Sequence, residues 1–192
     1  KKKSNLKNID NRLIFALAIS FISITSYFLI PSFYDQNKVK TLLENQILDK
    51  YNLEVKFDQS LRYGLLPKPH FYSDSTIISY KSKEIAQSNN TKISIFIKNF
   101  FSLENLVVSK LIFKKTDFKV DNSNFEFFIK LLNNKTNQKI NFTDSKLFYL
   151  NKNEDIIFLT EIKTLNYFFQ ENSLQKLNSK FNIFNIPINL YV

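Results

Sequence analysis

The chain has 192 residues and a net charge of +10, with 27 basic residues against 17 acidic ones. It contains one glycine, one histidine and no cysteine, methionine or tryptophan. This composition excludes a disulfide framework, a thiolate metal site and a glycine-rich phosphate-binding loop, so the stability of a folded domain must come from packing of apolar side chains.

The positive charge is concentrated at the N-terminus. Five of the first twelve residues are basic and only Asp10 is acidic. This tail therefore holds +4 of the net charge and leaves +6 for the other 180 residues. A basic cluster that precedes an apolar segment stays in the cytoplasm under the positive-inside rule. We expect residues 1–12 to form a cytoplasmic tail.

An uncharged apolar segment follows, from Leu13 to Ile30. As an α-helix its eighteen residues span about 27 Å, close to the thickness of the hydrocarbon core. A cleaved signal peptide is the alternative, but no small residues of a cleavage site follow the segment. We therefore predict an uncleaved transmembrane anchor over residues 13–34 and an exported domain over residues 35–192. The prediction rests on these anchor residues: Leu13, Phe15, Leu17, Phe21, Phe28 and Ile30.

A short amphipathic helix is predicted after the anchor. Asp35 is a suitable N-cap, and the following apolar residues recur at the three-to-four spacing of one helix face. They are Val39, Leu42, Leu43, Ile47 and Tyr51. Such a helix either lies on the bilayer surface or packs on a neighbouring sheet, and packing is the commoner outcome.

The next segment alternates between apolar and polar residues, with Gln59 as the single interruption. Leu53, Val55, Phe57, Leu61, Tyr63 and Leu65 alternate with polar residues and Gly64, and Pro67 and Pro69 end the pattern. The spacing predicts a strand with one apolar and one polar face, because successive side chains of a strand point to opposite sides. Proline ends it because it lacks the N–H that a sheet requires.

Strand patterns recur to the end of the chain. They cover residues 71–80, 87–97, 106–115, 140–150, 156–169 and 181–192, and in the last of these Phe184, Ile186, Ile188, Leu190 and Val192 share one face. One helix interrupts them, with Ser123 and Glu126 in a capping-box pattern and Phe125, Phe128, Ile129 and Leu132 on one face. The series predicts one mostly β domain with a few helices (α+β) and an extended antiparallel sheet. Because the chain starts without methionine and ends in an apolar run, we expect the domain to continue beyond Val192.

No catalytic, cofactor-binding or metal-binding residues are predicted. His70 has no cysteine or second histidine to join in a ligand set, and it is interpreted as a turn residue after Pro69. Lys110, Lys114 and Lys115 beside Phe113 form only a weak basic-aromatic pattern, and an exported chain rarely meets nucleic acid. We predict a protein that is not an enzyme, uses no cofactor and does not bind nucleic acid.

The order of these elements resembles the N-terminal region of the AsmA family of proteins anchored in the bacterial inner membrane. The resemblance covers the anchor, the helix over residues 35–51, the alternating strand, "LLPKPHFYSDSTIIS" (65–79) and "FFSLENLVVSKLIFKKTDFKV" (100–120). The chain departs from the family at Tyr51-Asn52, where a Gly-Arg pair is usual, and at Thr116-Asp117, where proline is common. The resemblance implies a long, curved β-groove that moves phospholipid between the inner and outer membranes or maintains the outer membrane.

Two functions remain open on the sequence alone. In the first, the apolar sheet face carries phospholipid acyl chains, and the domain is held on the periplasmic side of the inner membrane. In the second, the chain is a non-enzymatic periplasmic scaffold or assembly factor for outer-membrane proteins, and the same face is a closed core. The candidate lipid-facing or core residues are Leu53, Val55, Phe57, Leu61, Tyr63, Phe184, Ile186, Ile188 and Leu190.

Overall fold

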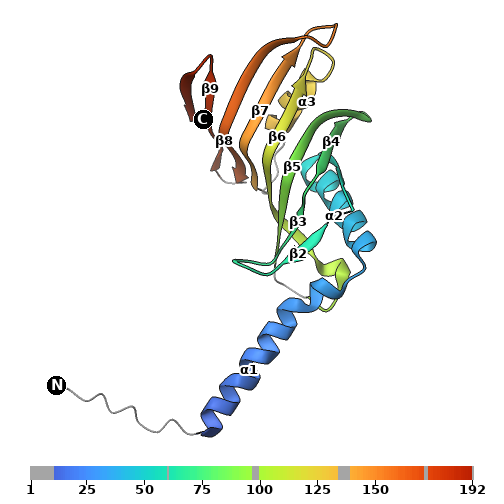
Figure 1. Cartoon of the computed structure of the whole chain (residues 1–192), viewed down its shortest axis with the longest axis vertical. Coiled ribbons are helices and arrows are strands. Elements are labelled where there is room, and N and C mark those ends of the chain that lie inside the picture. The colour runs from blue at the N-terminus through green and yellow to red at the C-terminus, as the bar shows by residue number, and fades with distance from the viewer. Residues whose placement is uncertain (1–10, 60, 97–99, 134–138, 171–172, 192) are drawn as a thin grey trace, which may run out of the picture.

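The structure, a computed structural model, describes residues 11–59, 61–96, 100–133, 139–170 and 173–191. Helix α1 (Asn11–Leu29) projects away from the rest of the chain (Figure 1), and a 3-10 helix, η1 (Ile30–Phe33), joins it to a β-rich domain. Together α1 and η1 are long and apolar enough to cross a membrane, and none of their most apolar stretch is buried.

Helix α2 (Gln36–Tyr51) begins and ends as the sequence predicts. The Asp35 carboxylate accepts a hydrogen bond from the Lys38 backbone N–H at 2.9 Å, which satisfies one free N–H of the first turn. Asn52 ends the helix in the left-handed conformation, with φ of 53°. Val39, Leu43, Ile47 and Tyr51 are buried in the core. The helix therefore packs on the sheet.

The described residues form one ten-stranded sheet. Its strands are β1 (Glu54–Phe57), β2 (Arg62–Gly64), β3 (His70–Ser73), β4 (Thr76–Tyr80), β5 (Lys83–Phe96), β6 (Val107–Val120), β7 (Lys139–Leu150), β8 (Ile156–Gln170), β9 (Ser173–Ile183) and β10 (Ile186–Tyr191). The spatial order is β1-β4-β5-β6-β7-β8-β9-β10, with β3 pairing with both β2 and β5. A short 3-10 helix, η2 (Leu103–Asn105), precedes β6.

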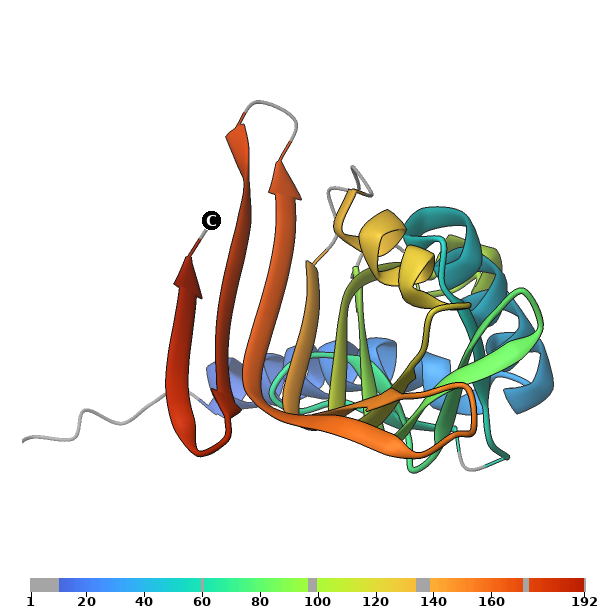
Figure 2. The same cartoon turned by 90° about the horizontal axis from the view of Figure 1, so that it is seen from above.

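The predicted fold class is confirmed, because the sheet is open, curled and mostly antiparallel. The one parallel pair is β6 with β7, and the connection between them contains α3 (Phe125–Asn133). Figure 2 shows α3 against one face of the sheet and the strands at the C-terminal edge extending beyond it.

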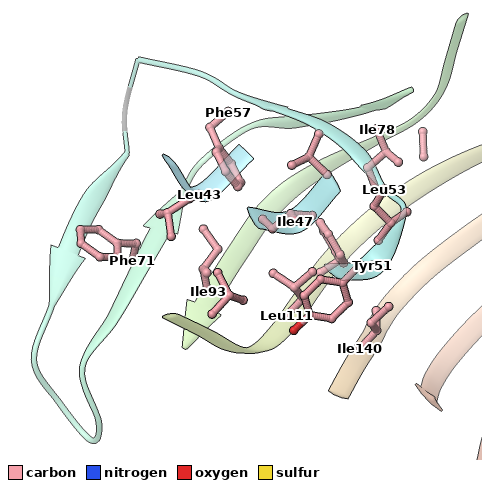
Figure 3. Close-up of a cluster of buried hydrophobic side chains, with 14 of the residues drawn as sticks. Leu43, Ile47, Tyr51, Leu53, Phe57, Phe71, Ile78, Ile93, Leu111 and Ile140 are labelled. Atoms are coloured by element: carbon pink, nitrogen blue, oxygen red, sulfur yellow. The ribbon is translucent and has the colours of Figure 1, made fainter. Parts of the chain in front are cut away.

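The core lies between α2 and the sheet. In Figure 3, Leu43, Ile47 and Tyr51 of α2 point toward Ile93 and Leu111 of the central strands. Two hydrogen bonds of the Gln46 side-chain amide fix the helix to the start of β6. Gln46 Nε2 donates to the Leu106 carbonyl at 2.5 Å, and Gln46 Oε1 accepts from Val108 N at 3.1 Å.

Three predicted strands are divided in the structure. The pattern over residues 52–65 forms β1 and β2, since the chain changes its pairing partner from β4 to β3. Residues 71–80 form β3 and β4, which follow one another along β5. Residues 181–192 contain a hairpin, because Phe184 and Asn185 both have positive φ and form a two-residue turn between β9 and β10.

The start of α3 also differs from the prediction. The Asp121 carboxylate accepts from Ser123 N at 2.7 Å and from Asn124 N at 3.0 Å, and the helix begins at Phe125, one residue later than a cap at Ser123 would place it. The buried face of the helix differs as well. Phe127 is buried and Ile129 is exposed, whereas the pattern placed Ile129 on the buried face. The side chain of Leu132 lies outside the described residues.

Candidate functional site

One continuous row of side chains crosses the face of the sheet on which α2 and α3 pack, which we call the concave face. Residues paired directly across neighbouring strands point to the same face. Starting at the β1 edge, the pairs connect Val55, Ile78, Ala86, Phe118, Leu147, Thr160, Ile183 and Ile186. This row of the concave face is therefore apolar from β1 to β10, except for the hydroxyl of Thr160.

Burial divides this row into two parts. Val55, Ile78, Ala86 and Phe118 are buried in the core. Beyond β6 the burial decreases, and Ile186 in β10 is 62% exposed. The N-terminal part of the concave face is thus a closed core, whereas the C-terminal part is open.

An apolar cavity lies at the boundary between these two parts. Its volume is about 480 Å³. Helix α3 and strands β6, β7 and β8 line it with Phe118, Val120, Phe125, Phe128, Ile140, Phe142, Leu147, Tyr149, Phe158, Ile162, Leu165 and Tyr167. None of these lining residues is charged. Ligand sites for apolar molecules are concave pockets of this size and composition.

Aromatic contacts hold α3 over this cavity. Phe118 meets Phe128 of the helix edge to face, with ring centroids 5.8 Å apart, and meets Phe142 of β7 in the same way at 5.1 Å. Tyr80 contacts Phe127 on the other side of the helix, at 5.3 Å. Edge-to-face pairs contribute about 0.5–1.5 kcal/mol beyond their buried area. The helix that covers the cavity is therefore fixed by rings from two strands, β4 and β6.

The N-terminus of α3 is held by Asp121. Lys83 Nζ contacts its carboxylate at 2.8 Å, and this pair links the start of β5 to the loop before α3. The Lys83 contact and the hydrogen bonds from Ser123 and Asn124 keep the pKa of Asp121 well below its usual range. Asn124 Nδ2 also donates to the Lys119 carbonyl at 2.8 Å, which fixes the loop to β6.

The polar groups of the cavity are confined to two tyrosines. Tyr149 donates its hydroxyl to Asn122 Oδ1 at 2.7 Å, so this hydroxyl is already satisfied by protein. Burial raises the pKa of Tyr167, which keeps its hydroxyl neutral. The cavity suits a neutral apolar chain, because its apolar lining offers no charged partner to an ionised group.

The first group of predicted site residues lies in the closed part. Leu53, Val55, Phe57 and Leu61 are all buried in the core beneath α2. Glu44 of α2 accepts from the Phe57 backbone N–H at 2.8 Å, which ties β1 to the helix. Tyr63 is half-buried, and burial raises its pKa to about 12.

The second predicted group lies in the open part. Ile186, Ile188 and Leu190 are on the concave face of β10, opposite Ile183, Phe181 and Ser179 of β9. Phe184 does not share this face as a strand residue, because it occupies the turn before β10 and is 79% exposed. Val192 lies outside the described residues.

The predicted anchor residues fall into two classes. Leu13, Phe15, Leu17 and Phe21 of α1 are exposed, as expected for side chains that face lipid. Phe28 and Ile30 are partly buried and pack against the domain core. The last turn of α1 therefore belongs to the domain as well as to the apolar segment.

Phe125 and Phe128 of the cavity lining were placed on one helix face from the sequence, whereas the lining residues of β6, β7 and β8 were not singled out, although strand patterns were predicted in all three. In β7, Ile140 and Phe142 occupy even positions, whereas Ser145, Leu147 and Tyr149 occupy odd ones. The change of parity at Asp144, where φ is 51°, hides the continuous face from a search for simple alternation. A search that allowed one skipped residue could have found it.

The described residues contain no group of three or more His, Cys, Asp or Glu side chains that could hold a metal ion. His70 is not a turn residue as interpreted from the sequence. It begins β3, is buried, and donates from Nδ1 to the Lys68 carbonyl at 2.7 Å. Burial lowers the pKa of this imidazole, in agreement with a structural role.

The sequence was also compared with known proteins. No protein-family model matches the chain, and no significant match is found among curated protein sequences. The assignment of a function therefore depends on the cavity, the open concave face and the apolar helix described above.

Proposed function

We propose that the chain is an AsmA-like membrane-anchored protein whose concave face binds phospholipid acyl chains, as one segment of a groove for lipid transfer between the inner and outer bacterial membranes. The observation that carries the proposal is the cavity of about 480 Å³, lined by apolar and aromatic side chains without a charge. The domain would face the periplasm, with the basic tail in the cytoplasm.

The hydrophobic effect supplies the driving force. Each buried CH₂ group contributes about 0.8 kcal/mol, so an acyl chain gains several kcal/mol when it leaves water for an apolar groove. The protein gains too, because open apolar side chains such as Ile186 and Leu190 would be covered. No catalytic group is needed for this kind of binding.

The shape of the sheet supports a path for an acyl chain beyond the cavity. The concave face continues from the cavity across β8 and β9 to β10 through paired residues, such as Ile162 with Phe181 and Phe181 with Ile188. On the opposite face of the same strands, Lys146 and Glu161 pair across β7 and β8, and Phe148 and Leu159 pair further along. A lipid chain could therefore lie along one face while water covers the other.

A specific observation also supports the alternative of a scaffold or assembly factor for outer-membrane proteins. The β1 part of the concave face is closed by α2, and Leu53, Val55 and Phe57 are buried there. For these residues the alternation reflects a protein core. The lipid proposal is therefore confined to the face formed by β6 to β10.

Site-specific photo-crosslinking tests the proposal in growing cells. A photoreactive residue at Leu165, which lines the cavity, should capture phospholipid. The same residue at Glu161 is the matched control, since it lies on the same strand but on the exposed, polar face. Absence of lipid at position 165 in a folded protein would sink the proposal, and capture of a protein there instead would favour the scaffold.

A further inference from the structure

The junction between α1 and the domain is a cluster of aromatic rings from distant parts of the chain. Tyr27 of α1 stacks on Phe100, with ring centroids 5.4 Å apart and planes 21° from parallel. Phe101 lies beside the same Tyr27 ring at 5.2 Å, and Phe28 meets Phe100 edge to face at 6.1 Å. The segment before η2 thus packs directly on the last turn of the helix.

Three tyrosine hydroxyls tie these segments together. Tyr63 of β2 donates to the Phe28 carbonyl at 2.7 Å, Phe100 N donates to the Tyr27 hydroxyl at 3.2 Å, and Tyr34 donates to the Phe100 carbonyl. Burial raises the pKa of Tyr63 to about 12, so its hydroxyl remains a donor at neutral pH. Because the bonds join α1 to two separate parts of the domain, the helix and the domain hold one relative orientation.

Two aromatic side chains at this junction are largely exposed. Phe33, at the end of η1, is 85% exposed, and Phe101 is 76% exposed although its neighbour Phe100 is fully buried. Scattered exposed apolar residues are normal on a protein surface. These two differ because they occur where a helix long enough to cross a membrane meets the domain.

The bilayer that α1 would cross is the partner that fits this surface. Tyrosine and tryptophan are enriched at the interface between hydrocarbon and water, and the wholly apolar ring of phenylalanine gains free energy when it leaves water for the edge of the hydrocarbon. Phe33 continues the apolar helix directly, and Phe101 is held against Tyr27 of that helix. A surface continuous with a membrane-spanning helix has the membrane beside it.

We propose that Phe33 and Phe101 lie in the interfacial layer of the bilayer spanned by α1, so that the domain stands on the membrane in one fixed orientation. This inference rests on the membrane anchoring in the proposed function and is independent of lipid binding in the cavity. In Figure 1 the strands β6, β7 and β8 and helix α3 lie at the end of the domain away from α1. The interface contact therefore holds the cavity at a set distance from the lipid surface.

Tryptophan fluorescence tests this arrangement cleanly, because the chain contains no tryptophan of its own. Single Phe33→Trp and Phe101→Trp variants of the full chain are reconstituted into vesicles of phosphatidylcholine and phosphatidylglycerol, with or without phosphatidylcholine brominated on its acyl chains. Phe21→Trp in α1 serves as the inserted reference, and Asn153→Trp, in the exposed turn between β7 and β8, serves as the water-exposed reference.

The expected result is blue-shifted emission and quenching by brominated lipid at positions 33 and 101, as at position 21, with neither effect at position 153. If position 21 is quenched while positions 33 and 101 behave like position 153, the interface contact is wrong and the anchor stands. If position 21 is not quenched either, α1 is outside the bilayer, and both the anchor and this inference fail.

Discussion

The neighbouring side chain of His70 explains why residue 64, the only glycine in the chain, has no side chain of its own. Gly64 pairs with His70 across β2 and β3. A Cβ atom at Gly64 would lie 2.7 Å from His70 Cε1 and 2.8 Å from Nε2, closer than van der Waals contact allows. The imidazole cannot move away freely, because it is buried and bound to the Lys68 carbonyl. Here glycine provides space for a neighbour and not a positive φ, since its backbone is extended.

Gly64→Ala should destabilise the domain by about 1–3 kcal/mol, the usual cost of overpacking a well-filled site. In a His70→Ala background the same substitution should cost little, because the clashing ring is gone. Denaturant unfolding of the two single variants and the double variant gives the coupling energy. An equal cost of Gly64→Ala in both backgrounds would mean that the histidine is not the cause.

At the scale of elements, one crease crosses the sheet. The regular pairing of neighbouring strands is interrupted at Lys115 of β6, at Asp144 of β7 and at Lys163 of β8. These three positions lie next to one another across the sheet. The division between β3 and β4 falls opposite Asn89 and Asn90 of β5, on the same line. Small hydroxyl residues, Ser88, Thr116 and Ser145, are buried beside it. Aligned irregularities of this kind bend a sheet, and they account for the curl that creates the concave face.

The crease explains which features could be predicted from the sequence. The cap and buried face of α2 depend only on local spacing and were predicted correctly. The breaks between β1 and β2 and between β3 and β4 depend on tertiary pairing, so the sequence showed two long strands where there are four short ones. The Phe184-Asn185 turn was missed because neither residue is glycine, which is the usual signal for two positive φ angles.

Lys115 provides a test of the crease. Its φ of 51° lies in the left-handed region, which costs a residue with a Cβ about 1 kcal/mol or more. Lys115→Gly should therefore stabilise the domain, by up to about 1 kcal/mol. Lys119→Gly is the matched control, because Lys119 is exposed on the same strand without a positive φ, and it should destabilise by about 0.5–1 kcal/mol. Thermal unfolding of both variants makes the comparison, and destabilisation by Lys115→Gly would contradict the strained conformation.

At the scale of the whole molecule, one face of the sheet is a closed core in one part and open in the other. Under α2 it is a core, sealed by Leu43, Ile47 and Tyr51. Beyond α3 the same rows continue without a helix among the described residues to cover them, as Figure 2 shows. The alternation of the sequence is the same in both parts, which is why the sequence left a core and a lipid groove as equal alternatives. The positions of the helices distinguish the two parts, and these positions are set by tertiary packing.

The two parts should respond differently to a buried charge, and this is the most direct test of the division. Phe57→Asp places an unpaired carboxylate in the sealed core, where residue 57 is buried, and should cost several kcal/mol, enough to unfold a domain of ordinary stability. Leu165→Asp places the same group in the cavity beside the open face, where water can reach it, so the domain should stay folded while phospholipid capture is lost. Glu54→Lys and Glu161→Lys, on the exposed face of the same two strands, control for charge alone and should change neither folding nor lipid capture.

Circular dichroism measures folding, and the amount of lipid that co-purifies with the detergent-extracted protein measures capture. A folded Phe57→Asp variant, or a folded Leu165→Asp variant that still carries phospholipid, would show that the boundary between core and groove is drawn in the wrong place.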